Sequence, residues 1–129
     1  MTTQDGTARE AVVPPELLAA LATRETEARE RAERLGVQLR DVVEAAAGSN
    51  SDDEHDPEGA TIAFERQQVV ALLRQAEEEL AELAAARDRV AAGVVGTCEA
   101  CGGQIGSARL AARPTARTCI ACAGGPGGR

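Results

Sequence analysis

Four cysteines, the only ones in the chain, constrain this sequence more than any other feature. They form two Cys-x-x-Cys pairs, Cys98 with Cys101 and Cys119 with Cys122, separated by 17 residues. Two such pairs at this spacing are typical of a tetrahedral site in which four thiolates bind one Zn²⁺ ion. Four protein ligands leave no open position for water, so we expect the metal to stabilise the fold rather than to catalyse a reaction. The sequence therefore predicts one structural zinc ion.

Glycines beside the cysteines support this interpretation. Gly102 and Gly103 follow the first pair and Gly124 follows the second, and a backbone without Cβ strain can turn its N–H groups toward thiolates. Three alternatives for four cysteines are two disulfides, a thioredoxin-like redox pair and an iron–sulfur cluster. A signal peptide, which would favour disulfides, is not recognisable. The βαβ pattern that surrounds a thioredoxin-like pair is not recognisable either.

The composition argues against a large globular core. The chain has 129 residues and a hydrophobic fraction of 43%, but much of that fraction is alanine, and there is one Phe and no Trp or Tyr. Its net charge is −7 and all its Lys and Arg positions are Arg. An acidic chain without stacking aromatics is a poor nucleic-acid binder, so we expect no sequence-specific DNA binding. No apolar run is long enough for a membrane helix, and we expect a cytoplasmic, monomeric protein without membrane contact.

Heptad spacing predicts a first long helix. Pro14 and Pro15 suit the start of a helix, because proline in the first turn loses no needed N–H, and no proline follows as far as Ala47. Two heptad positions are apolar, one carrying Leu18, Ala32, Leu39 and Ala46 and the other Leu21, Ala28, Leu35 and Val42. Together these two positions form an apolar seam along the helix, and Glu25 is its polar exception.

A second helix is predicted over about residues 61–92. Its heptad seam carries Ile62, Val69, Ala76, Leu83 and Val90, with Leu73 and Leu80 at the companion position and Arg66 and Arg87 at the ends of that position. The segment between the helices is rich in acids: Asp52, Asp53, Glu54, Asp56 and Glu58. Two matched seams joined by a short turn can be buried by folding back on each other. We therefore predict an antiparallel coiled-coil hairpin with an acidic tip.

The predicted fold class is mainly α, a long antiparallel coiled-coil hairpin with a small four-cysteine zinc finger at its base. The predicted organisation is a flexible lead at 1–13, the hairpin at 14–93 with its tip at 49–60, the finger at 94–123 and a flexible tail at 124–129. We interpret His55 as an exposed loop residue and Phe64 as a packing residue near the tip, with partner anchoring as the alternative for Phe64. No arrangement of nucleophile, base and orienting acid is apparent, so we expect no enzymatic activity.

The finger residues resemble a known family. The matching run covers residues 96–102, Ile105, residues 109–116 and residues 119–122. It is similar to the zinc-finger signature of the TraR/DksA family of bacterial transcription factors, and the preceding hairpin extends the resemblance to most of the chain. The resemblance implies binding to RNA polymerase, with the hairpin inserted into the secondary channel and its acidic tip near the catalytic centre. It assigns the tip contacts to Asp56, Pro57 and Glu58.

The tip departs from the family pattern at its last three positions, residues 59–61. Members of the family carry Asp-Pro-x-Asp-Arg-Ala there, and in this chain Gly59 stands where the second aspartate is expected. Arg109, Arg113 and Arg117 are candidate docking residues for an acidic partner surface, or alternatively partners of the hairpin's own acids. The second functional hypothesis is a zinc-stapled helical hairpin that acts as a protein-interaction scaffold unrelated to polymerase.

Overall fold

The computed structural model describes residues 13–48 and 57–124. Within these residues the chain forms two long helices, α2 (Pro15–Gly48) and α3 (Pro57–Ala92), and two short ones, α4 (Ser107–Ala112) and α5 (Ile120–Gly124). In the described part of the chain the extended structure is limited to an isolated antiparallel bridge between Thr97 and Gln104. Most of the predicted lead and tail, together with residues 49–56 of the predicted tip, lies outside the described residues.

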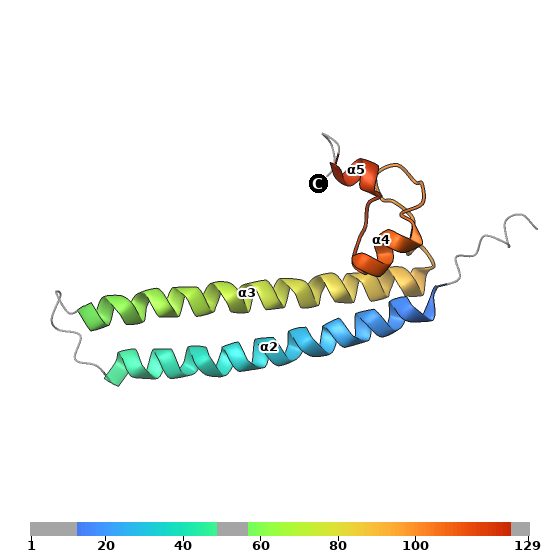
Figure 1. Cartoon of the computed structure of the whole chain (residues 1–129). Coiled ribbons are helices and arrows are strands. Elements are labelled where there is room, and N and C mark those ends of the chain that lie inside the picture. Colours follow the sequence, from blue (N-terminus) through green and yellow to red (C-terminus); the bar gives the residue numbers. More distant parts are fainter. Residues whose placement is uncertain (1–12, 49–56, 125–129) are drawn as a thin grey trace, which may run out of the picture. The chain divides into compact units, whose positions relative to one another are not determined.

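The two long helices pack as a hairpin, and the finger follows directly after α3 (Figure 1). This arrangement confirms the predicted fold class. The described residues group into two compact units. We call residues 26–48 and 57–80 the hairpin unit, and residues 13–25 and 81–124 the metal unit.

The core of the hairpin unit is built from the predicted seams. Leu35, Val69 and Ala76 are buried together, and three half-buried residues of the companion positions pack against them: Ala32, Leu39 and Leu73. Beside this core Arg31 donates to Glu79 over 2.9 Å. Because both side chains are well exposed, the ion pair adds little stability and mainly flanks the apolar seam.

The helical part of the metal unit has two leucines at its core. Leu21 and Leu83 are fully buried, as their heptad positions predict. The expected seam residue Leu18 is instead 42% exposed, and its neighbour Leu17 is buried. Leu17 lies four residues before Leu21 and so shares its face of the helix. A helix of 3.6 residues per turn drifts away from a strict seven-residue repeat, and the apolar face here follows the drift.

An ion pair lies on the seam of the metal unit. Arg87 Nη2 donates to Glu25 Oε1 over 2.9 Å, and the Glu25 side chain is 24% exposed. Both residues stand out in the sequence as charges at seam positions, but their pairing does not follow from either helix alone. The Nε of Arg87 is buried without a hydrogen-bond partner. A partly satisfied pair of this kind favours one register of the two helices more than it raises stability.

The start of α3 differs from the prediction. The helix begins at Pro57 rather than near residue 61, because the fixed φ of proline suits the first turn and its missing N–H is not needed there. Residues 57–60 of the predicted tip are therefore helical. Phe64, on the second turn, is 70% exposed, so its interpretation as a packing residue is wrong.

None of the helices in the described ranges combines the length and the apolar character that crossing a membrane requires.

Truncation of a buried seam residue should destabilise the hairpin. We expect Leu83→Ala to lower the free energy of unfolding by about 2–5 kcal/mol, because the cavity is only partly refilled. The matched control on the same helix is Leu72→Ala, whose side chain is 45% exposed and which should change stability by no more than about 0.5 kcal/mol. Urea denaturation followed by circular dichroism at 222 nm measures both. Equal effects of the two substitutions would contradict the observed seam.

Candidate metal centre

A glycine at the end of α3 turns the backbone toward the metal centre. Val94 N–H donates to Arg89 O over 3.0 Å and Gly93 N–H donates to Val90 O over 3.1 Å. These are the two bonds of a Schellman motif, whose left-handed residue is Gly93 with φ of 75°. The last carbonyls of the helix are thus satisfied while the backbone reverses, so that the first cysteine follows the end of α3 by only a few residues.

Cys98 and Cys101 lie on a tight turn. Ile105 N–H donates to Gly96 O over 2.8 Å, and Cys98 N–H donates to Gly103 O over 2.7 Å. The first bond closes the turn at its two ends, and the second lies further inside it, next to the cysteines. Cys98 is buried, and Cys101 is exposed.

Two adjacent glycines make room for the sulfur of Cys101. Gly102 has φ of 76°, a conformation that other residues rarely adopt. Gly103 donates its N–H to Cys101 Sγ over 3.4 Å, and a Cβ on Gly103 would lie 3.3 Å from that sulfur. The expectation that these glycines direct N–H groups toward the thiolates is thus confirmed for Gly103.

The second pair is held by a helix rather than by a turn. Cys119 immediately precedes α5 and Cys122 lies within it, and Ala123 N–H donates to Cys119 O over 2.9 Å. Residues three apart in a helical turn share one face, so both sulfurs point to the same side. Glu99 N–H donates to Arg117 O over 2.9 Å. This bond ties the first turn to the segment that leads into the second pair.

A small apolar cluster packs against one side of the metal centre. Ile105, Leu110 and Ala116 are buried together with Cys98, and Cys119 and Cys122 pack against them. Pro114, from the segment between the two pairs, is fully buried as well. The cluster shields one side of the sulfurs from water, which strengthens their attraction to a cation.

The four sulfurs fit a single zinc ion. All four lie within 4.8 Å of one another, and Cys101 Sγ is 3.9 Å from Cys119 Sγ. A tetrahedron with Zn–S bonds of about 2.3 Å places its sulfurs about 3.8 Å apart. All four cysteines are free of disulfide bonds. The ligand set predicted from the spacing is therefore brought together, and a metal held here is structural because the four thiolates fill its coordination.

The electrostatics of the thiols also favour a cation. Backbone N–H groups, first that of Cys119 and then that of Cys101, lower the pKa of the Cys98 thiol to about 6. The neighbouring sulfurs, first that of Cys119, raise the pKa of Cys122 to about 12. Some thiolates thus form easily, but negative charge on the first ones opposes ionisation of the last. A divalent cation removes this opposition, as expected for a Zn²⁺ site.

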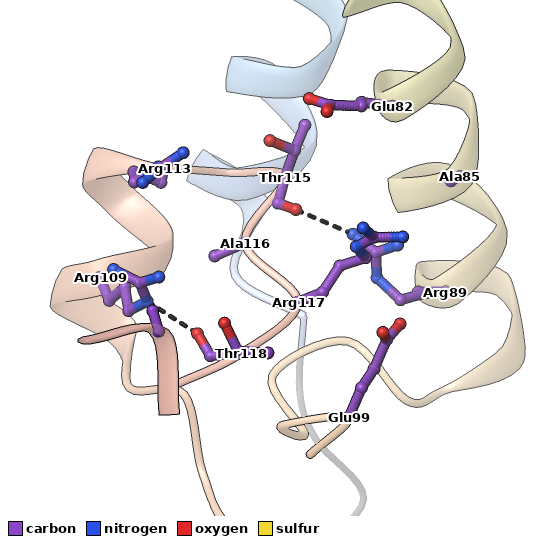
Figure 2. A pocket seen from close by; sticks show the side chains of 11 residues that line it. Glu82, Ala85, Arg89, Glu99, Arg109, Arg113, Thr115, Ala116, Arg117 and Thr118 are labelled. Atoms are coloured by element: carbon purple, nitrogen blue, oxygen red, sulfur yellow. Dashed lines mark hydrogen bonds between the residues drawn. The ribbon is translucent and has the colours of Figure 1, made fainter. Parts of the chain in front are cut away.

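The predicted docking arginines line a pocket of about 280 Å³ beside this centre. Arg109 turns inward and donates from Nε to Thr118 O over 2.8 Å (Figure 2), whereas Arg113 and Arg117 are exposed. A fourth arginine, Arg89 of α3, donates from Nη2 to Thr115 O over 3.2 Å. Burial is the main cause that lowers the pKa of Arg89, opposed by the charge of Glu99.

Arg89 was missed in the sequence because it lies outside both the seam and the finger signature. Its position in the last turn of α3, where cations are favoured, is the signal that points to it.

The predicted tip residues are described only in part. Asp56 lies outside the described residues. Pro57 and Glu58 form the start of α3, and their side chains also lie outside the described part of the chain.

Loss of one ligand should release the metal. We expect the purified chain to contain about one zinc ion and Cys101→Ser to lose it, which unfolds the finger and leaves the long helices largely folded. The measurements are elemental analysis for zinc and circular dichroism for helix content. The control Ser107→Ala changes an exposed residue outside the site and should keep its zinc. Full zinc retention by Cys101→Ser would contradict the assignment.

Comparison with known proteins agrees with the geometry. Residues 93–125 match the family model of the prokaryotic dksA/traR C4-type zinc finger. Searches of the curated proteins and of the solved structures gave no match for the chain. The matched segment contains both cysteine pairs, the two short helices and the arginines of the pocket that follow α3. The metal centre is therefore similar, over residues 93–125, to the C4-type zinc finger of prokaryotic dksA/traR proteins.

Proposed function

We propose that this chain is a transcription regulator that binds RNA polymerase directly and inserts its hairpin into the secondary channel to modulate initiation. The observation that carries the proposal is a DksA/TraR-type C4 finger that directly follows an antiparallel helical hairpin. The finger supports a zinc-binding regulator of that family. Polymerase as the partner is inferred from the family resemblance.

The helices suit a probe that must reach into a channel. α2 has 34 residues and α3 has 36, so each extends about 50 Å at the standard helical rise. Screening in salt reduces electrostatic effects over distances of about 10 Å. Acids that act on a Mg²⁺-containing centre must therefore be carried close to it, and the length of the two helices suits this task.

The proposed effector residues lie at the point in the sequence where α3 begins. Asp56 and Pro57 match the family's tip pattern, and Glu58 supplies a carboxylate one residue before the second aspartate position. α3 begins within this group. Asp56 is the proposed effector because it occupies the family's first aspartate position. Gly59, at the second aspartate position, supplies no charge, so Asp56 and Glu58 carry the negative charge of this group.

The proposed docking contact uses the two outward arginines of the pocket. Arg113 and Arg117 are exposed, and Glu82 and Glu99 line the same pocket. Its four arginines and two glutamates give a local positive charge on a chain of net charge −7. Such a patch suits an acidic protein surface. Arg109 is withdrawn from the docking set because its Nε is bonded to Thr118 O.

We propose no catalytic role for the metal centre. Four thiolates saturate a tetrahedral zinc ion and leave no position for substrate or water. The proposed activity is thus regulatory and proceeds through protein contact.

The effector proposal is tested by Asp56→Asn in transcription reactions with purified polymerase. We expect this variant to displace a Gre-type factor from the secondary channel as well as the wild type does, but to lose its effect on open-complex lifetime. The charge-matched control is Asp53→Asn, which should retain both properties. An unchanged lifetime effect in Asp56→Asn would contradict the role of this carboxylate.

The docking proposal is tested by charge reversal. We expect the double variant Arg113→Glu and Arg117→Glu to weaken polymerase binding several-fold, with a larger loss at low salt because exposed charges are less screened there. Arg24→Glu and Arg29→Glu, both exposed on the half of α2 nearer its start and thus far along the helix from the proposed tip, form the control with the same charge change. Binding measured by fluorescence anisotropy at two salt concentrations distinguishes them. Equal losses in the two double variants would indicate a general charge effect.

An interaction scaffold unrelated to polymerase is the second candidate. It is favoured by Phe64 and Leu72 on α3, whose side chains are 70% and 45% exposed, because exposed large apolar residues on a helix favour protein contact. This function predicts no displacement of the Gre-type factor by the wild-type chain. The displacement experiment therefore separates the two candidates before any variant is made.

A further inference from the structure

Arg109 is bonded to the peptide that leads into the second cysteine pair. It lies in α4 and is half-buried, and its Nε donates to Thr118 O over 2.8 Å (Figure 2). A bond from a charged donor at this distance is stronger than a neutral one. The acceptor belongs to the residue immediately before the zinc ligand Cys119.

The same peptide unit leads directly into the zinc ligand Cys119. The C=O of Thr118 and the N–H of Cys119 belong to one planar trans peptide, so they point in opposite directions. The sulfur of Cys119 lies within 4.8 Å of the other three ligand sulfurs. A guanidinium, a peptide plane and a ligand residue are therefore linked in one continuous chain.

We propose that Arg109 is a positioning residue for the metal centre. Its bond to Thr118 O fixes the peptide plane that joins Thr118 to Cys119, and it thereby holds the first ligand of the second pair in place. Its charge acts in the same direction, because four thiolates around a divalent cation carry an excess of negative charge. This inference concerns the zinc site alone and does not depend on polymerase as the partner.

The segment before Cys119 is held at neighbouring positions as well. Thr115 O accepts a hydrogen bond from Arg89 of α3, and Arg117 O accepts one from Glu99 N–H of the first cysteine turn. Three carbonyls within four residues thus receive donors from α3, from the first turn and from α4. In this set the Arg109 bond is the one adjacent to a ligand, so its loss should affect the metal most directly.

The test compares zinc release from Arg109→Met, Arg109→Lys and Arg113→Met. Methionine keeps an apolar stem but removes the donor and the charge. Arg113→Met is the matched control because Arg113 lines the same pocket and is exposed. Loss of a group that orients a ligand typically weakens metal binding by about 10–100-fold. We expect Arg109→Met to release zinc to a chromophoric chelator at least about tenfold faster than Arg113→Met, with Arg109→Lys between them.

Cobalt substitution supplies a readout that a merely structural role would not move. Co²⁺ in a tetrahedral thiolate site has a sulfur-to-metal charge-transfer band whose energy depends on hydrogen bonds to the sulfurs. In Arg109→Met we expect this band to shift to lower energy, because loss of the nearby positive charge makes the thiolates better electron donors. Arg109→Lys should move the band back toward the wild-type position.

Two results would overturn the proposal. One is a zinc-release rate for Arg109→Met within about twofold of that for Arg113→Met. The other is a lysine variant no better than the methionine variant in both release rate and band position, because this would assign the effect to packing of the arginine stem. A methionine variant that fails to take up metal, together with a lysine variant that binds it, would support the proposal.

Discussion

The metal unit depends on the attraction between four thiolates and one divalent cation. Without that cation the sulfurs oppose one another, as the pKa of Cys122 near 12 indicates. The apolar cluster beneath them contains Ile105, Leu110 and Ala116 besides the cysteines, which is little buried surface for a segment of this length. Metal binding supplies the free energy that the cluster lacks, because a structural zinc site contributes directly to folding. The glycines, the turn and the short helix α5 all serve to bring sulfurs to one point.

The two long helices pack in one register although the seam between them consists mostly of small residues. An alanine-rich seam allows close approach but discriminates weakly between registers. The pair formed by Glu25 and Arg87 supplies the missing discrimination, because a register shift would leave two charges on the seam without each other. The Nε of Arg87 is buried without a hydrogen-bond partner, which lowers the contribution of this pair to stability.

The sequence predicted those features that depend on spacing. Cysteine spacing gave the ligand set, and heptad spacing gave the hairpin and its seam residues Leu21 and Leu83. Predictions of which side chain points toward the partner helix were less successful. Leu17 replaces Leu18 on the buried face because a helix is not an exact seven-residue repeat. Phe64 is exposed because an aromatic residue is buried only where the partner helix offers a matching space, which the sequence of one helix does not reveal.

The arginines show most clearly where sequence reasoning ends. Arg109, Arg113 and Arg117 follow one another at four-residue intervals and are indistinguishable by charge or composition. The structure separates them, because α4 directs Arg109 toward Thr118 O, whereas Arg113 lies just after the helix and Arg117 in the following segment, where both are exposed. A guanidinium bonded to a carbonyl beside a zinc ligand has lost part of its capacity to bind a partner. Within one positive pocket, then, Arg109 differs from the exposed Arg113 and Arg117 in the backbone carbonyl that lies within its reach.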